Sequence, residues 1–247
     1  MKEYDTLTTL LGKFNKYICS MEESFSDNEP IATSGDARLF LKIFSSSGDN
    51  TNPLEKISFM RLEDGKIKNM HDKNLLDSGE FTTATFMPKD TSPLPLCAME
   101  ASFHFNKYVQ CRADLPPLST DKKYKETFCK PLQELRHTCE ALPGLLPMTS
   151  LPGLEEFSSG GLLAANIDLK YKETAMKWLL DYADLYLTFL DTRESYPILK
   201  EPSIIDEGKQ RKTAFRQMFK KMTPRILSDT PEMYSDELAG KLGELLF

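Results

Sequence analysis

The sequence predicts an α+β fold in which helices pack on an antiparallel β-sheet. Strand-like segments follow one another with short links through the first half of the chain, as is typical of antiparallel pairing. The second half has mainly helical periodicity. With 247 residues, 40% of them hydrophobic, the chain can bury a sizeable core, and we expect one domain over residues 1–247.

The first half begins with a helix and continues as strands. Apolar residues recur on one helical face over 4–21, and a polar loop is expected over 25–35. Segments with alternating or β-branched residues predict strands at 38–44, 55–62, 80–87, 96–105 and 108–115. The sequence Glu63-Asp64-Gly65-Lys66 is typical of a hairpin turn.

The second half supplies the remaining helices and one strand. The predicted helices span 121–142, 170–191, 207–222 and 231–246. Pro131 should interrupt the first of these, and Thr223-Pro224 should close the third. The Gly-, Pro- and Ser-rich stretch 144–165 predicts a loop, with a short strand at 162–166 that brings the sheet to about six strands.

Composition excludes several classes of function. The net charge of −6 argues against a protein that coats nucleic acid. No apolar run reaches the roughly 18 residues of a membrane span, and the first residues lack the apolar core of a signal peptide. We therefore expect a cytoplasmic protein, or one of the plastid stroma if a transit peptide has been removed, as a monomer or weak dimer.

Cysteine and histidine usage gives no metal or disulfide signal. The five cysteines have no CxxC spacing, so a reducing compartment is expected, with Cys97 and Cys111 as small core residues. The three histidines are too scattered for a metal site. The phosphate-binding glycine motifs, the GxSxG elbow and HExxH are absent, so any catalysis must use carboxylate, His or Arg side chains.

Glu100 is the strongest catalytic candidate in the sequence. It lies within an otherwise apolar strand, where an unpaired carboxylate costs several kcal/mol and a protonated one is a good proton donor near neutral pH. A structural acid paired with Arg112 or Arg38 is the alternative. His104 and Ser102 share its strand parity, and His104 could be either a proton relay or a hydrogen-bonded edge residue.

A basic run follows near the end of the chain. The seven basic residues from Lys209 to Arg225 carry +7 without an acid, so the rest of a chain of net charge −6 carries −13. Helical periodicity places Lys209, Lys212, Arg216 and Lys220 on one stripe. The stripe is either a solvated helix face or a surface that attracts an acidic partner.

Four segments resemble the ferredoxin-dependent bilin reductases, a family that includes red chlorophyll catabolite reductase. They are Ser34-Gly35-Asp36-Ala37-Arg38-Leu39, Pro95-Leu96-Cys97-Ala98-Met99-Glu100, Ala113-Asp114-Leu115-Pro116, and the tail from Phe215 through Thr223-Pro224-Arg225 to Pro231-Glu232-Met233-Tyr234. Their order and spacing match the family over most of the chain. The resemblance implies an α/β/α sandwich with an open-chain tetrapyrrole between the sheet and the C-terminal helices. It also implies reduction by reduced ferredoxin, with protons from side chains and no bound cofactor or metal.

The resemblance also assigns roles to residues. Glu100 falls on the central-strand proton donor, which is Asp in most bilin reductases and Glu in the chlorophyll-catabolite branch. Thr223 falls on a second family acid and departs from the pattern, because threonine cannot donate a proton as a carboxylic acid does. Glu63 aligns with a third acid, although an EDGK turn is more often solvated.

We therefore expect two groups of site residues. The catalytic candidates are Glu100, His104 and Thr223; the substrate-binding candidates are Glu63, Ser102, Arg112, Arg216 and Arg225. Arg216 and Arg225 are the candidates for holding pigment propionates, whereas Lys209 and Lys212 are candidates for docking ferredoxin. A non-catalytic tetrapyrrole-binding protein and an unrelated interaction domain with a structural Glu100 are the competing hypotheses.

Overall fold

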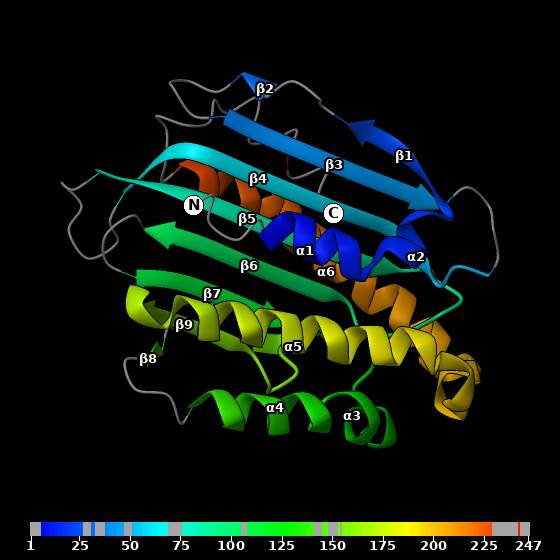
Figure 1. Ribbon diagram of the computed structural model, residues 1–247. Coiled ribbons are helices and arrows are strands. Elements are labelled where there is room, and N and C mark those ends of the chain that lie inside the picture. Colours follow the sequence, from blue (N-terminus) through cyan, green and yellow to red (C-terminus); the bar gives the residue numbers. More distant parts are fainter. Residues whose placement is uncertain are drawn as a thin grey trace.

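A single antiparallel sheet forms the centre of the protein. The computed structural model describes residues 6–26, 31–32, 38–46, 51–68, 76–104, 108–140, 145–147, 153, 155–228 and 242. The strands among them are β1 (Met21–Ser26), β2 (Ile31–Ala32), β3 (Arg38–Ser46), β4 (Leu54–Lys68), β5 (Leu76–Pro88), β6 (Cys97–His104), β7 (Tyr108–Asp114), β8 (Leu145–Pro147) and β9 (Leu163–Asp168). Their order is β1-β3-β4-β5-β6-β7-β9-β8, with β2 paired to β3 (Figure 1). Every pairing is antiparallel, as the sequence predicted.

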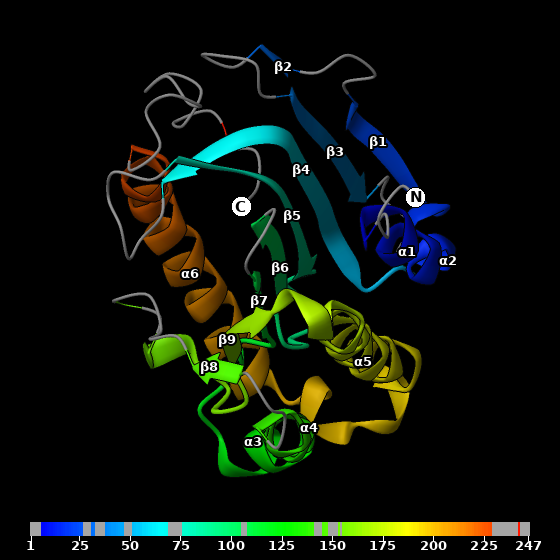
Figure 2. The same ribbon diagram turned by 60° about the vertical axis from the view of Figure 1, so that its left-hand side comes forward.

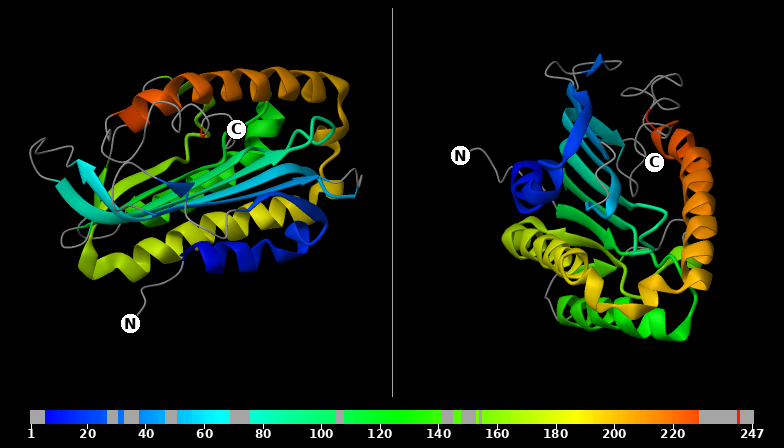
Figure 3. Two further views of the ribbon diagram at one scale, coloured as in Figure 1. Left: turned by 90° about the horizontal axis from the view of Figure 1, so that it is seen from above. Right: turned by 90° about the vertical axis from the view of Figure 1, so that its right-hand side faces the viewer.

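Helices cover both faces of this sheet. They are α1 (Thr6–Lys13), α2 (Asn15–Ile18), α3 (Lys122–Phe128), α4 (Lys130–Glu140), α5 (Lys172–Asp191) and α6 (Pro202–Ser228), with short 3-10 turns η1 (Glu155–Phe157), η2 (Leu169–Tyr171), η3 (Arg193–Ser195) and η4 (Pro197–Lys200). Figure 3 shows the sheet between α6 on one side and α1 and α5 on the other. This arrangement confirms the predicted α/β/α sandwich. Among the described residues, no helix has both the length and the apolar character needed to cross a membrane.

The apolar core lies between the sheet and α5. Helix α5 buries one continuous face that includes Trp178, Tyr182 and Tyr186. Phe86 of β5 contacts Phe14 at a ring-centroid distance of 4.1 Å and Tyr186 at 5.8 Å, which joins the N-terminal helical turns and α5 to the sheet. Aromatic side chains bury large areas, so this cluster fixes α5 and the N-terminal helices on one face.

The predicted hairpin turn at Glu63-Asp64-Gly65-Lys66 is wrong. Strand β4 continues through these residues to Lys68. Leu62 pairs with Phe81 and Gly65 with Gly79, so two residues of β4 lie opposite one residue of β5. A β-bulge of this kind uses the same Gly-containing polar sequence as a turn, which explains the error.

The helix predicted over 207–222 is longer than expected at both ends. Helix α6 runs through Thr223-Pro224 and ends at Ser228. A proline removes one backbone hydrogen bond, but the flanking turns can stay helical. In contrast, Pro131 does mark a break, because α3 ends at Phe128 and Pro131 lies in the first turn of α4, where its missing N–H costs nothing.

Most other differences concern short elements. The helix predicted over 4–21 ends at Ile18, and β1 begins at Met21. Strands β1, β2 and β8 raise the described total to nine, against about six predicted. The helix predicted over 231–246 lies almost entirely outside the described residues.

Candidate active site

The two faces of the sheet differ in chemistry. The face toward α1 and α5 is apolar and includes Phe59, Ala84, Met99, Ala101 and Cys111. The opposite face, over which α6 runs (Figure 2), carries polar residues, and we give the name polar face to eight of them at its centre: Ser58, Thr83, Thr85, Glu100, Ser102, Gln110, Arg112 and Asn166. Met87 shows that this face is turned toward α6, because Met87 has the same parity as Thr85 on β5 and packs with Phe215 of α6.

Several members of the polar face are buried although they add nothing to an apolar core. Ser58, Thr85 and Ser102 are 1%, 3% and 2% exposed. Buried polar side chains are more informative than exposed apolar ones, because burial of a polar group costs free energy unless it has a partner. The polar face is therefore the part of the sheet best suited to bind a partly polar ligand.

Strand register arranges the polar face in rows. One row across β5, β6 and β7 contains Thr83, Glu100 and Arg112 as directly paired residues. Opposite side chains on one face lie about 5 Å apart at Cβ, so Glu100 has a hydroxyl on one side and a guanidinium on the other. The neighbouring row across β6, β7 and β9 contains Ser102, Gln110 and Asn166.

Glu100 is the acid at the centre of this face. Burial raises the pKa of Glu100 above its ordinary value, and the positive charge of Arg112 partly offsets that shift. A raised pKa keeps more of the carboxyl protonated near neutral pH, so Glu100 can give up a proton to a bound molecule. Arg112 therefore fits both hypotheses from the sequence. It is the cross-strand partner of Glu100, and it is a substrate-binding candidate on the same face of the sheet.

For the four remaining predicted residues, the structure describes the position of the backbone but not of the side chain. His104 ends β6 in register with Gly79 and Tyr108. Glu63 of β4 is in backbone register with Arg38 of β3, and Thr223 and Arg225 lie in the last turns of α6. The side chains of His104, Glu63, Thr223 and Arg225 are outside the described part of the chain, so their roles stay predictions.

Sequence reasoning missed Thr83, Gln110 and Asn166. The hydroxyl of Thr83 donates a 3.1 Å hydrogen bond to the Met99 carbonyl, and its oxygen keeps lone pairs that can accept from a protonated Glu100. The alternation of each strand was readable in the sequence, but the register that joins four strands into rows was not. The pairing of β5 with β6, of β6 with β7 and of β7 with β9 brings these residues near Glu100.

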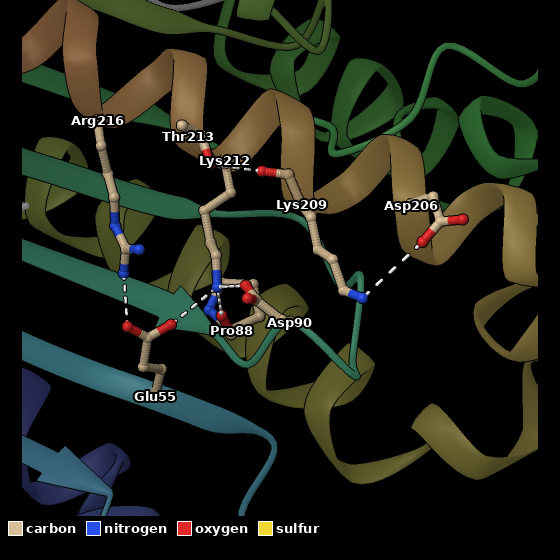
Figure 4. A network of polar contacts seen from close by, with 8 residues as sticks. All are labelled: Glu55, Pro88, Asp90, Asp206, Lys209, Lys212, Thr213 and Arg216. Atoms are coloured by element: carbon tan, nitrogen blue, oxygen red, sulfur yellow. Dashed lines mark hydrogen bonds and ion pairs between the residues drawn. The ribbon is translucent and has the colours of Figure 1, made fainter.

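The basic stripe is not the open docking surface that the sequence suggested. Lys212 is 2% exposed, and its Nζ donates to Glu55 Oε2 at 2.8 Å and to the Pro88 carbonyl at 3.0 Å, with Asp90 as a further ion-pair partner (Figure 4). Arg216 Nη2 donates to Glu55 Oε1 at 2.7 Å. Helical periodicity alone could not show that acids of β4 and of the β5–β6 connection lie beneath this side of α6.

Burial and the charges of this ion network shift the pKa values of Glu55 and Lys56. Burial opposes ionisation of Glu55, yet the hydrogen bonds from Lys212 and Arg216 lower the pKa of that carboxyl below its ordinary value. Burial lowers the pKa of Lys56 to about 8, and the charges of Arg216 and Lys220 act in the same direction. Glu55 comes five residues before Met60, which pairs with Thr83 in the Glu100 row, so the network lies roughly 15 Å along the strand from that row.

The first half of α6 is fixed by further polar contacts. Glu207 accepts from the Thr120 backbone N–H at 2.8 Å and from the Ser119 hydroxyl at 2.5 Å. Arg211 donates to the carbonyls of Pro117 and Glu156 at 3.1 and 2.8 Å. These contacts hold α6 at the end of the sheet where β6 begins, and the helix extends from there over the polar face (Figure 2).

Asp114 has a structural role at the end of β7. Its Oδ1 accepts from the Leu115 backbone N–H at 2.8 Å, and the Ser159 hydroxyl also donates to it. These bonds join the end of β7 to the loop that precedes β9. Burial raises the pKa of Asp114 to about 6, against the effect of the hydrogen bonds from Ser159 and Leu115.

This shift predicts a pH-dependent contribution to stability. A raised folded-state pKa means that the native protein binds more protons than the unfolded chain between about pH 4 and pH 6, so Asp114 lowers stability as the pH rises through that window. Asp114→Asn should remove this slope. Urea unfolding from pH 4 to pH 7 should show the variant gaining about 2–3 kcal/mol relative to wild type; a constant difference would contradict the shifted pKa.

The described residues show no metal centre, and four of the five cysteines are buried. Within the described part of the chain, no group of three His, Cys, Asp or Glu side chains could hold a metal ion. All five cysteines are free thiols. Burial raises the pKa of Cys97 and Cys111, so both are poor nucleophiles and behave as core residues.

Comparison with known proteins shows the fold. A scan against protein-family models and a search of curated proteins both found no match. Among solved structures, the chain is similar to selenomethionine-labelled phytochromobilin synthase from tomato in complex with biliverdin, with a TM-score of 0.67 and 14% identity over 96% of this chain and 79% of that one. The fold expected from the sequence resemblance is therefore confirmed in three dimensions.

Proposed function

We propose that the protein reduces an open-chain tetrapyrrole, a bilin such as biliverdin or a chlorophyll catabolite, with electrons from reduced ferredoxin. The observation that most supports this is Glu100, whose carboxyl has a raised pKa at the centre of the polar face. The fold shared with a protein crystallised with biliverdin supports the choice of ligand class. The reaction would be that of an oxidoreductase that acts on CH–CH groups with an iron–sulfur protein as donor.

The chemistry requires protons that the chain can supply. Reduction of one carbon–carbon double bond of the pigment takes two electrons and two protons. Ferredoxin gives one electron at a time, so a pigment radical forms between the two steps and must be protonated. Glu100 would give one proton and recover it from solvent, while Arg112 would stabilise the carboxylate left behind. His104 is our candidate for the second proton, because position 223 is threonine.

Ferredoxin docking needs exposed positive charge, since charge complementarity speeds association without a large apolar interface. With Lys212 buried and Arg216 paired to Glu55, the exposed lysines on α6 are Lys209, Lys220 and Lys221. Changing these three to Glu should slow ferredoxin-driven reduction several-fold and flatten its dependence on ionic strength. If turnover stays salt-dependent, docking lies elsewhere, and Lys122, Lys123 and Lys125 of α3 are the next candidates.

A non-catalytic tetrapyrrole-binding protein on the same fold is the second candidate. The threonine at position 223 favours it, because one family acid is missing there. Such a protein would use the polar face and α6 to hold a pigment without changing it.

One experiment separates these functions. Biliverdin is titrated into the purified protein, and its absorption spectrum is followed before and after addition of reduced ferredoxin. A red-shifted, protein-bound spectrum that then changes with ferredoxin supports the reductase; a bound spectrum that stays constant supports the binding protein. Absence of any bound spectrum would reject both for this pigment.

A further inference from the structure

Asn166 on β9 is partly exposed as a residue but has a buried acceptor atom. Its carboxamide oxygen Oδ1 has essentially no solvent contact and no hydrogen-bond donor in the structure as described. A buried acceptor without a donor costs about 1–3 kcal/mol, and such groups are uncommon in native proteins. An unsatisfied acceptor therefore needs an explanation, and a bound molecule that donates a hydrogen bond is one.

The place of Asn166 in the sheet points to that molecule. It pairs with Gln110, which pairs with Ser102, so these three form the row beside Thr83, Glu100 and Arg112. The separation of two strands and two residues puts Asn166 roughly 12 Å from Glu100 on the same face. An elongated ligand that lies across the polar face can touch both residues.

Asn52 is a buried structural asparagine with which the hydrogen bonding of Asn166 can be compared. It is 3% exposed, its Nδ2 donates to the Tyr17 carbonyl at 3.0 Å and to Ser20 Oγ at 2.8 Å, and its Oδ1 accepts from the Leu54 N–H at 2.9 Å. Both ends of that carboxamide are satisfied by the protein itself. Asn166 differs because its acceptor is left unused.

We propose that Asn166 Oδ1 accepts a hydrogen bond from a pyrrole or lactam N–H of the tetrapyrrole, and so fixes the position of the ring farthest from Glu100. This inference rests on the proposed function and adds a residue and a ligand group to it. Pyrrole and lactam rings present N–H donors along one edge, which matches an acceptor on a polar sheet face. Asn166 would then determine which part of the pigment lies over Glu100.

The test compares stability with binding in one pair of variants. Asn166→Leu has nearly the same shape without the acceptor, so the free protein should be as stable as wild type or more stable to urea. Its affinity for biliverdin, measured by absorption titration, should fall about tenfold or more. Asn52→Leu is the matched control: it should lose stability, and the folded fraction should bind biliverdin like wild type. Asn166→Ala provides a second variant with the same expected loss of affinity.

Three outcomes would contradict the inference. If both Asn166 variants bind biliverdin within twofold of wild type, the inference is wrong while the proposed function stands. If Asn166→Leu loses as much stability as Asn52→Leu, the acceptor is satisfied in the free protein and the inference is also wrong. If wild type does not bind biliverdin, both the proposed function and the inference are wrong for this pigment.

Discussion

Glu100→Gln is expected to bind biliverdin within a few-fold of wild type and to lose about 10²-fold or more of its rate of reduction. The amide keeps the size and shape of the side chain in its row between Thr83 and Arg112 but cannot donate an acidic proton. Binding is measured by absorption titration and turnover by the loss of the pigment band with reduced ferredoxin in excess. Near-native turnover with glutamine would remove Glu100 from the mechanism.

Two controls make this result specific. Glu134→Gln changes an exposed acid of α4 whose partner is Lys130, and it should leave binding and turnover unchanged. The pH dependence gives the second control. Because burial raises the pKa of Glu100, the protonated donor is lost as the pH rises through that raised value, and wild-type turnover should fall on the alkaline side. Glu100→Gln should lack that decline.

The sequence predicts the fold more completely than it predicts the site. Strand alternation and short links were enough for the antiparallel sheet, and the amphipathic pattern of 170–191 matches α5 closely. Glu100 could be found because a carboxylate in an apolar strand is rare. Thr83, Gln110 and Asn166 could not, since an ordinary threonine or amide becomes significant only when register puts it in the row of Glu100 or in the row beside it.

Two errors have a common physical cause. Glu63-Asp64-Gly65-Lys66 has the composition of a turn but forms a bulge, because β5 is long enough to pair beyond it. Lys212 has the periodicity of a solvated stripe but is buried, because Glu55 and Asp90 come to it from other segments. In both cases a partner distant in the chain decides between two conformations or environments that the local sequence allows equally well.

Lys212→Glu is expected to destabilise the protein by about 4 kcal/mol or more, or to prevent folding. The three protons of the Lys212 ammonium meet Glu55, Asp90 and the Pro88 carbonyl, so every donor is used (Figure 4). A glutamate there would place a third carboxylate against Glu55, Asp90 and the Pro88 carbonyl; Arg216 would still donate to Glu55, but the ammonium that bridges the three groups would be lost. Position 212 is itself buried, at 2% exposure, so the introduced carboxylate would be desolvated and face two like charges, which costs several kcal/mol.

Lys209→Glu is the matched control on the same helix, one turn earlier. The Lys209 side chain is 48% exposed and lies 3.8 Å from Asp206, so its reversal should change stability by less than about 1 kcal/mol. Urea unfolding of both variants measures the contrast. If Lys212→Glu unfolds within 1 kcal/mol of wild type, the network around Glu55 does not form in solution. If the contrast is found, charge reversal at Lys212 reports on folding rather than on docking, and a test of ferredoxin binding must use Lys209, Lys220 and Lys221.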